Sequence, residues 1–581
     1  MLMLGGLSPL LLPKSKTQRR ISLITTQMTW PTTVMMASRI NSTNRMKISS
    51  MRLQPLAQTG DTDRHSVIQT TPKHSQTTMN LFEAIFAHDP AVPAIHYQGR
   101  DLTYGELRAR TLRMAQALTS LGTTPADRVA LLLNDSPEFI EAFIATCSLG
   151  AIAVPINMAL RLDEQCSILH NSGARLVLAE DDICNMLQTG APEKLRTDEI
   201  RILSLKSVLD KIGDTPVPEF QDPKENEPAF ILYTSGSTGE PKGAVHRQAD
   251  IFYTNQTFCR EVLRVTKNDR LFSSSRLPFA YGLGNSFTFP LLNGATTILC
   301  HEKPTPDVIA HILATARPTI FFAVPVVYNL LLEHHRSGRQ LDCSSLRLCV
   351  SAGEALPAHL GEEWEREFDV QLLDGIGSTE MLHMFMSNHE NDVRYGSSGR
   401  MLDGYEARLL DENGEPTPEG VEGNLWIKGD SASRYYWERP EETARTFVDG
   451  WVRTGDLYRR DSDGYWFHMG RSDDCFKSSG QWVSPVEVEG VLLRHADVSR
   501  VAVVEDFDEH LLPCACAFVV RQDVESDPGV VETGLRDLAA ASLPRFKQPR
   551  KYVFVNELPY TATGKVQRFK LRQSLRNKEQ G

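Results

Sequence analysis

The sequence contains no long apolar segment. No window of its 581 residues approaches the ~18 to 20 consecutive apolar residues that a membrane-spanning helix needs, so we expect no membrane span. The ten cysteines are scattered, and they include no C-x-x-C pair and no Cys/His cluster. This spacing disfavours structural zinc and a disulfide framework, and it favours reduced thiols in a cytosol-like compartment.

Acidic side chains outnumber basic ones over the whole chain. There are 62 Lys and Arg against 73 Asp and Glu, and the net charge of −11 argues against nucleic-acid binding. Residues 1–60 reverse this balance, since they hold eight basic side chains and no Asp or Glu. Two interpretations of residues 1–78 stay open: a mitochondrial transit peptide, which is basic and poor in acids, or a disordered tail before a true start at Met79. The predicted compartment is cytoplasmic, or mitochondrial if this extension directs import.

The chain is too long for a single hydrophobic core, so we expect at least two domains. From residue 80 to about 470, strand-like and helix-like segments alternate, which predicts layered α/β subdomains with mostly parallel strands. Beyond a charged stretch at 471–474 the pattern becomes a short α+β module, which predicts a second, smaller domain. The expected helices are 107–121, 137–147, 486–494 and 531–542, and the expected strands are 128–133, 151–155, 229–232, 295–299, 319–324, 346–351, 498–504 and 514–520.

A segment rich in glycine and hydroxyls follows the apolar run at 229–232. It reads TSGSTGEPKG from Thr234 to Gly243 and includes one lysine, Lys242. Glycines let backbone N–H groups approach phosphate oxygens, hydroxyls donate further hydrogen bonds, and the ammonium adds positive charge. The Walker pattern G-x-x-x-x-G-K-[ST] is not met, because Pro241 stands where its second glycine would be. The segment therefore predicts a polyphosphate site that is not of the Walker type.

This segment resembles the phosphate loop of the adenylate-forming superfamily, which includes acyl- and aryl-CoA ligases, luciferases and peptide-synthetase adenylation domains. Further similar segments follow in the expected order between about residues 80 and 575: DGIGSTE at 374–380, TGD at 454–456, GRSDD at 470–474 and TGK at 563–565. The resemblance implies ATP and Mg²⁺ as cofactors and coenzyme A as co-substrate. It also implies a large adenylate-forming domain at 79–472 and a small, mobile C-terminal domain at 473–581, with the hinge at Asp473.

The resemblance further implies roles for individual residues. The expected phosphate-binding set is Thr234, Ser235, Gly236, Ser237, Thr238, Gly239 and Lys242. Glu380 is the expected metal ligand, Thr379 the expected donor to the α-phosphate, and Lys565 the expected bridge between the acid and the α-phosphate. The expected contacts to the rest of ATP are Gly353, Glu354, Asp374, Gly375, Asp456 and Arg471. Lys477 and Gly480 are expected on the face that admits pantetheine.

Two segments, FAYGLGN at 279–285 and the stretch from 375 to 388, are similar to the benzoate-CoA ligase branch of the superfamily. In that branch they line a flat aromatic slot, which suits an aryl ring because glycines leave a thin gap and an aromatic wall packs against it. The expected slot residues are Ala280, Tyr281, Gly377, His383 and Met384. The chain departs from the branch at Met384, Arg276, Pro278 and Gln481–Trp482. Hydroxy-, amino- and halobenzoates and cinnamates therefore remain open beside benzoate.

The leading hypothesis is an ATP-dependent aryl-CoA ligase that converts benzoate to benzoyl-CoA, AMP and pyrophosphate through an acyl-adenylate, in aromatic catabolism or secondary metabolism. The alternative is a stand-alone adenylation enzyme that loads a carrier protein. A nucleotide-binding pseudoenzyme is disfavoured because every expected charged residue is present, and a fatty acyl-CoA ligase is disfavoured by the narrow slot. The expected partners are an aryl acid, ATP and CoA, and a homodimer is left open.

Overall fold

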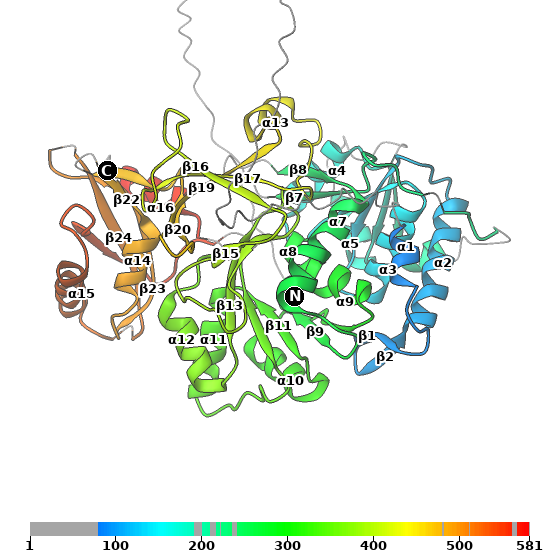
Figure 1. Ribbon diagram of the computed structural model, residues 1–581, viewed down its shortest axis with the longest axis horizontal. Helices are drawn as coiled ribbons and strands as arrows, with labels where there is room; N and C mark the ends of the chain where they lie inside the picture. The colour runs from blue at the N-terminus through cyan, green and yellow to red at the C-terminus, as the bar shows by residue number, and fades with distance from the viewer. Residues whose placement is uncertain are drawn as a thin grey trace, which may run out of the picture. The chain divides into compact units, whose positions relative to one another are not determined.

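The computed structural model describes residues 80–190, 200–209, 216–220, 222–234, 241–478, 481–510, 512–523, 525–560 and 566–579. The chain divides into two compact units, Met1–His74 and Ser75–Gly581. The first unit lies outside the described residues, and so does the extension predicted at 1–78. All the described helices and strands belong to the second unit (Figure 1).

A six-stranded sheet carries the first half of this unit. Its strands lie in the order β6 (Arg201–Ser204), β5 (Leu176–Ala179), β3 (Arg128–Leu132), β4 (Ile152–Pro155), β7 (Phe230–Thr234) and β8 (Lys242–His246). All neighbours are parallel except β7 and β8. Strands β3, β4 and β5 are short apolar runs buried along nearly their whole length, as expected of parallel strands covered by helices on both faces.

The helices around this sheet begin with clear sequence signals. The side chains of Thr103 and Glu106 form a capping box at the start of α2 (Tyr104–Ser120), and Pro137 opens α3 (Pro137–Ser148). Helix α7 (Gln248–Thr254) continues directly into a π-helical segment, η2 (Asn255–Leu263). The remaining helices are α1 (Leu81–Ile85), α4 (Leu162–Ser172), α5 (Asp181–Gly190) and α6 (Leu205–Leu209).

A nine-stranded sheet comes next along the chain. Its order is β15 (Arg400–Met401), β14 (Met384–Ser387), β13 (Leu372–Gly377), β12 (Leu348–Ser351), β11 (Ile320–Ala323), β9 (Arg270–Ser273), β10 (Thr296–Leu299), β1 (Pro93–Tyr97) and β2 (Arg100–Thr103). The strands from β13 to β1 are parallel, and only the two edges are antiparallel. Its helices are α8 (Ala280–Leu283), η3 (Gly284–Thr288), α9 (Phe289–Leu292), α10 (Pro306–Ala316), α11 (Pro325–Arg336) and α12 (Ala358–Phe368), and Figure 1 shows α10, α11 and α12 beside this sheet.

Residues 406–471 form a third sheet that the sequence did not predict. It is antiparallel, and its strands are β16 (Glu406–Leu410), β17 (Gly423–Lys428), β18 (Phe447–Val448), β19 (Trp451–Arg460) and β20 (Trp466–Arg471), with helix α13 (Pro440–Thr446) inserted. Burial alternates along β17, because one face packs on the core of the nine-stranded sheet while the other is more open. The predicted parallel α/β layers are confirmed for the two large sheets. The antiparallel sheet is a third, separate sheet that packs on the core of the nine-stranded one.

The described residues from 476 to 579 form an α+β module, as predicted. A two-stranded ribbon, β21 (Phe476–Ser478) and β22 (Gln481–Val483), precedes α14 (Pro485–Leu492), and a three-stranded sheet combines β23 (Val498–Phe507), β24 (Pro513–Arg521) and β25 (Lys551–Phe554). Helices α15 (Pro528–Ser542) and α16 (Arg568–Glu579) complete it. Cys514 and Cys516 are buried on β24. A domain boundary at 472/473 stays a prediction.

Aromatic packing joins the two large sheets. The ring of Phe143 on α3 lies 5.4 Å from that of Phe230 on β7 and 5.3 Å from that of Phe287 on η3, measured between centroids. All three side chains are fully buried in one cluster. No helix in the described part of the chain is both long and apolar enough to cross a bilayer.

We expect Phe143→Ala to lower the free energy of unfolding by about 3–5 kcal/mol, because it removes a ring on which both sheets pack and leaves a cavity. Urea unfolding followed by tryptophan fluorescence measures this loss. The matched control is Phe507→Ala at the end of β23, where the side chain is 40% exposed and the cost should stay within about 0.5 kcal/mol. Equal losses in the two variants would contradict the assignment of Phe143 to the shared core.

Candidate active site

The predicted phosphate segment starts and ends on two paired strands. Thr234 closes β7 and Lys242 opens β8, and the two residues lie opposite each other in the antiparallel register. Ser235, Gly236, Ser237, Thr238 and Gly239 lie outside the described residues. The pairing fixes both ends of the predicted segment at one edge of the six-stranded sheet.

Tyr436 links Lys242 to Glu380. The Tyr436 hydroxyl donates a hydrogen bond to Glu380 Oε1 at 2.6 Å, and Lys242 Nζ lies 5.6 Å from the centroid of the Tyr436 ring. Tyr436 itself is buried, and burial together with the neighbouring Glu380 carboxylate raises its pKa well above the usual value. The phenol therefore keeps its proton and serves as a donor. The predicted phosphate lysine and the predicted metal ligand thus share one aromatic neighbour.

Asp456 and Arg471 face each other across β19 and β20. Arg471 Nη1 lies 3.0 Å from Asp456 Oδ1, and His468 Nε2 lies 3.6 Å from the same oxygen. Burial alone would raise the pKa of Asp456, but the polar contact with His468 and the charge of Arg471 outweigh it and lower the pKa to about 2. Both contacts involve Oδ1. The charge of Glu380 also acts on Arg471, which places these groups in one electrostatic neighbourhood.

The residues expected near adenine lie at and beyond the carboxyl ends of β12 and β13. Ser351 pairs with Asp374 in the parallel register, and Gly353 follows β12 with a φ of +94°, a left-handed conformation that favours glycine. Asp374 is buried, and burial raises the pKa of its carboxyl well above the usual value. A Cβ on Gly375 would lie 2.6 Å from the Met386 carbonyl oxygen. Glu354 is partly buried, and its charge adds to those of Glu489 and Asp474, which together raise the pKa of Arg568 against the opposing effect of burial.

An aromatic cluster contains two of the predicted slot residues. The ring of His383 lies 5.6 Å from that of Tyr281, 5.2 Å from that of Phe258 and 4.6 Å from that of Phe289, between centroids. Burial lowers the pKa of His383 to about 3, although the backbone of Tyr281 favours the protonated ring. His383 is therefore a neutral ring at neutral pH. The Tyr281 hydroxyl donates to the Val350 carbonyl at 3.0 Å, which fixes its ring.

The glycines near this cluster are explained by close packing within the protein. A Cβ on Gly377 would lie 2.5 Å from the His383 carbonyl oxygen, at the bulge where β13 pairs with β14. A Cβ on Gly284 would lie 2.5 Å from His383 Cδ2. Met384 is fully buried beside Gly375, and Ala280 is partly buried at the start of α8. The structure thus brings Tyr281, Gly377, His383 and Met384 together, while their role in binding an acid stays a prediction.

In the C-terminal module, Lys477 Nζ pairs with Glu412 Oε1 at 2.7 Å and lies 4.9 Å from the Trp482 ring centroid. Asp474, next to the predicted hinge residue Asp473, pairs with Arg572 at 2.9 Å and with Arg568 at 3.7 Å. Gly480 and Lys565 lie outside the described residues. Their predicted roles are not tested by the geometry.

Among the described residues no group of three or more His, Cys, Asp or Glu is placed to hold a metal ion. A Mg²⁺ ion is commonly bound through one or two carboxylates together with substrate phosphates. The partly exposed Glu380 carboxylate fits that pattern, since Tyr436 contacts only its Oε1. The donor set therefore suits a cation that arrives with a polyphosphate.

Sequence reasoning missed three residues of this site: Tyr436, His468 and His246. His246 Nε2 lies 2.8 Å from the Thr379 carbonyl oxygen. None of the three belongs to a segment with an unusual local composition. Each is recognised only by its contact with a predicted site residue that lies elsewhere in the sequence.

Residues 82–437 match the family described as AMP-binding enzyme, and residues 487–565 match the AMP-binding enzyme C-terminal domain. Among curated proteins, the chain is 40% identical over 481 residues to a benzoate–CoA ligase of Thauera aromatica, covering 81% of this chain and 90% of that protein.

Two solved structures are also similar. An anthranilate CoA ligase, AuaEII, in complex with anthranoyl-AMP has a TM-score of 0.81 and 34% identity, covering 86% of this chain and 97% of that one. A benzoate CoA ligase from Burkholderia xenovorans LB400 has a TM-score of 0.78 and 37% identity, covering 85% of this chain and 100% of that one.

The low pKa of His383 predicts a pH-dependent stability. The unfolded chain binds a proton at this histidine below about pH 6.5, whereas the folded protein does so only near pH 3, so stability falls with pH between these values. From pH 8 to pH 5 the loss from this group should be about 2 kcal/mol. We expect His383→Phe, which keeps a ring in the cluster, to lose less stability than the wild type over this range in thermal unfolding.

The control is His311→Phe on α10, an exposed position, which should follow the wild-type pH dependence. Equal losses of stability in His383→Phe and the wild type between pH 8 and pH 5 would contradict this prediction. They would mean that the pKa of His383 is not lowered in the folded protein.

Proposed function

Because the chain belongs to the AMP-binding enzyme family, we propose that it is an ATP-dependent aryl-CoA ligase of AMP-forming type that acts on benzoate or a close aryl acid. The observation that carries this proposal is the convergence of Lys242, Tyr436, Glu380, Arg471 and Asp456 in one neighbourhood. Those groups supply cations, a metal-binding carboxylate and a hydroxyl-binding carboxylate, the set that a nucleoside triphosphate needs.

The proposal that the substrate is an aryl acid is supported by the hairpin of β13 and β14. Glu380 lies in the turn of this hairpin, and His383 at the end of the same turn packs against Tyr281, Phe258 and Phe289. Aromatic walls with little polar surface favour a flat ring. The two named relatives that act on benzoate and the structure with anthranoyl-AMP support this substrate class.

In the first half-reaction, a carboxylate oxygen of the acid attacks the α-phosphorus of ATP and pyrophosphate leaves. Lys242 would balance charge on the departing phosphates, and Asp456 would accept hydrogen bonds from the ribose through Oδ2, since Arg471 and His468 both contact Oδ1. Glu380 and ATP would together hold Mg²⁺, which neutralises charge that develops on the phosphate oxygens. Thr379 and Lys565 would contact the α-phosphate side of the reacting bond.

In the second half-reaction, the thiol sulfur of CoA attacks the acyl carbon and AMP leaves. The acyl group is already activated, so the step requires no nucleophile from the protein. The ten cysteines form no disulfide in the part of the chain that is described, and eight of them are buried. Lys477 and Gly480 would lie where the pantetheine arm enters.

The direct test incubates the full-length protein with ATP, Mg²⁺, CoA and a panel of benzoates, anthranilate, cinnamates and fatty acids, and measures acyl-CoA and AMP by mass spectrometry. We expect benzoyl-CoA, or the thioester of a close aryl acid, to exceed every aliphatic product. AMP release without a thioester would point to a carrier protein as the acceptor. Failure with every aryl acid would overturn the proposal.

Lys565 provides a second prediction. We expect Lys565→Ala to slow adenylation, measured as benzoate-dependent ATP–pyrophosphate exchange, by about 10²–10³-fold, because a positioned donor at the reacting phosphate is lost. Thioester formation from synthetic benzoyl-adenylate and CoA should change only a few-fold.

The matched control for this variant is Lys570→Ala, an exposed lysine on α16, which should leave both rates close to the wild type. Equal losses of the two rates in Lys565→Ala would show that Lys565 does not act specifically in adenylation.

A further inference from the structure

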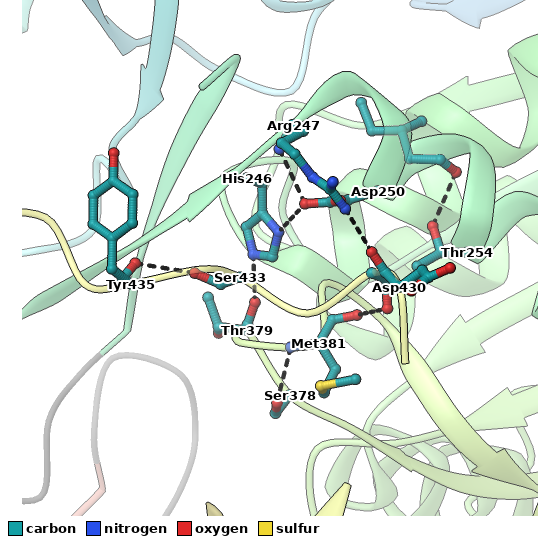
Figure 2. A network of polar contacts seen from close by, with 12 residues as sticks. His246, Arg247, Asp250, Thr254, Ser378, Thr379, Met381, Asp430, Ser433 and Tyr435 are labelled. Atoms are coloured by element: carbon teal, nitrogen blue, oxygen red, sulfur yellow. Dashed lines mark hydrogen bonds and ion pairs between the residues drawn. The ribbon is translucent and has the colours of Figure 1, made fainter. Parts of the chain in front are cut away.

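His246 lies at the end of β8 and is fully buried. Its Nε2 lies 2.8 Å from the carbonyl oxygen of Thr379, and its Nδ1 lies 3.1 Å from Asp250 Oδ2 (Figure 2). A carbonyl oxygen only accepts hydrogen bonds, so we assign a hydrogen to Nε2. The imidazole therefore donates to the backbone of the turn that contains Glu380.

Asp250 and Arg247 hold the other side of this imidazole. Asp250 Oδ1 accepts from Arg247 Nε at 2.9 Å and Nη2 at 2.7 Å, and Oδ2 accepts from the Arg247 backbone N–H at 3.0 Å. Arg247 Nη2 also donates to the Asp430 carbonyl at 2.7 Å. Figure 2 shows the three side chains in one continuous network. With three donors from Arg247 on it, the carboxylate is fixed, and so is the ring beside it.

The turn that follows β13 is anchored at three successive carbonyls. The Thr379 carbonyl accepts from His246, the Glu380 carbonyl from the Ser433 backbone N–H at 2.7 Å, and the Met381 carbonyl from Ser431 Oγ at 2.9 Å. The turn also contains a non-glycine residue, Leu382, at a φ of +65°. Such a conformation costs free energy and persists only where neighbouring contacts enforce it.

Of the three anchors, only that of His246 comes from a side chain on β8. The same strand begins at Lys242, four residues earlier. Side chains at positions 242, 244 and 246 lie on one face of a strand, spaced by about 3.3 Å per residue. One short, rigid strand therefore carries the lysine proposed for the phosphates and also holds the turn proposed for the metal.

We propose that His246 is a positioning residue for adenylation: its Nε2–H fixes the Thr379 carbonyl and so sets where Thr379 and Glu380 stand relative to Lys242. This inference rests on the proposed function, because it assumes that Glu380 and Lys242 act on one MgATP. His246 is fully buried, so we infer that it acts through the turn and not by touching a substrate. Its effect is confined to the half-reaction that uses the triphosphate.

The test compares His246→Leu, His246→Gln and His246→Asn in the full-length protein. Leu removes both hydrogen bonds, Gln keeps an amide that can reach the Thr379 carbonyl, and Asn keeps one that can reach Asp250. We expect His246→Leu to lower benzoate-dependent ATP–pyrophosphate exchange by about 10- to 100-fold and to raise the Mg²⁺ concentration that gives half-maximal exchange. Thioester formation from synthetic benzoyl-adenylate should stay within about two-fold of the wild type.

His246→Gln should recover at least about five-fold more exchange activity than His246→Asn, because only Gln restores the donor to Thr379. The comparison of His246→Gln with His246→Asn tests the role of the Nε2–H donor even if His246→Leu does not fold. The control is Thr111→Val, which removes a buried hydrogen bond to the Leu107 carbonyl within α2 and should leave the ratio of the two half-reactions unchanged.

Unchanged exchange in His246→Leu, an equal loss of both half-reactions in a folded variant, or greater activity in His246→Asn than in His246→Gln would each overturn this inference. A wild-type protein that forms no aryl-adenylate would instead overturn the proposed function itself. The two failures are therefore distinguished by the wild-type reaction.

Discussion

The hydrogen bond from Tyr436 to Glu380, together with the contact between the Tyr436 ring and Lys242, connects three parts of the chain that are distant in sequence. Glu380 belongs to the turn after β13, Tyr436 to the segment that pairs with β8 through an isolated bridge at Ala244, and Lys242 to the start of β8 itself. The segment from Ser433 to Tyr436 donates two hydrogen bonds to Glu380. The Ser433 N–H donates to its carbonyl oxygen, and the Tyr436 hydroxyl donates to its carboxylate. A carboxylate fixed in both main chain and side chain is prepared for a cation and does not have to be ordered when one binds.

Charge balance explains why these groups lie together. Two carboxylates, Glu380 and Asp456, stand beside the place proposed for a highly anionic triphosphate, and without cations they would repel it. Arg471 offsets both, since it pairs with Asp456 and the charge of Glu380 also raises its pKa. Because the pKa of Asp456 is lowered to about 2, this carboxylate remains an acceptor over the whole range in which an enzyme works. In the proposed function, the site would thus present a fixed acceptor for hydroxyls and separate cations for phosphates, an arrangement that costs no reorganisation during reaction.

The sequence was most informative where local chemistry determines structure. Apolar runs such as 128–133 and 151–155 became β3 and β4, and the Pro137 signal opened α3. The antiparallel sheet at 406–471 was missed because its amphipathic strands lack the apolar runs of the parallel ones. His246 and Tyr436 were missed for a different reason. Their significance arises from contacts across 133 and 56 positions of sequence, and no local pattern records such a pairing.

In the proposed function, the β13–β14 hairpin would couple the choice of acid to its activation. Gly377 allows the two strands to close because any Cβ there would meet the His383 carbonyl, and this closure sets both the His383 ring and the Glu380 turn. A change that moves the ring also moves the backbone of the proposed metal ligand, since only two residues separate them. Selectivity in this protein should therefore be expressed in the rate of adenylation as well as in the affinity for the acid. In the proposed function, an acid that fits the aromatic cluster poorly would also disturb the geometry of the phosphates, because the cluster and the Glu380 turn belong to one hairpin.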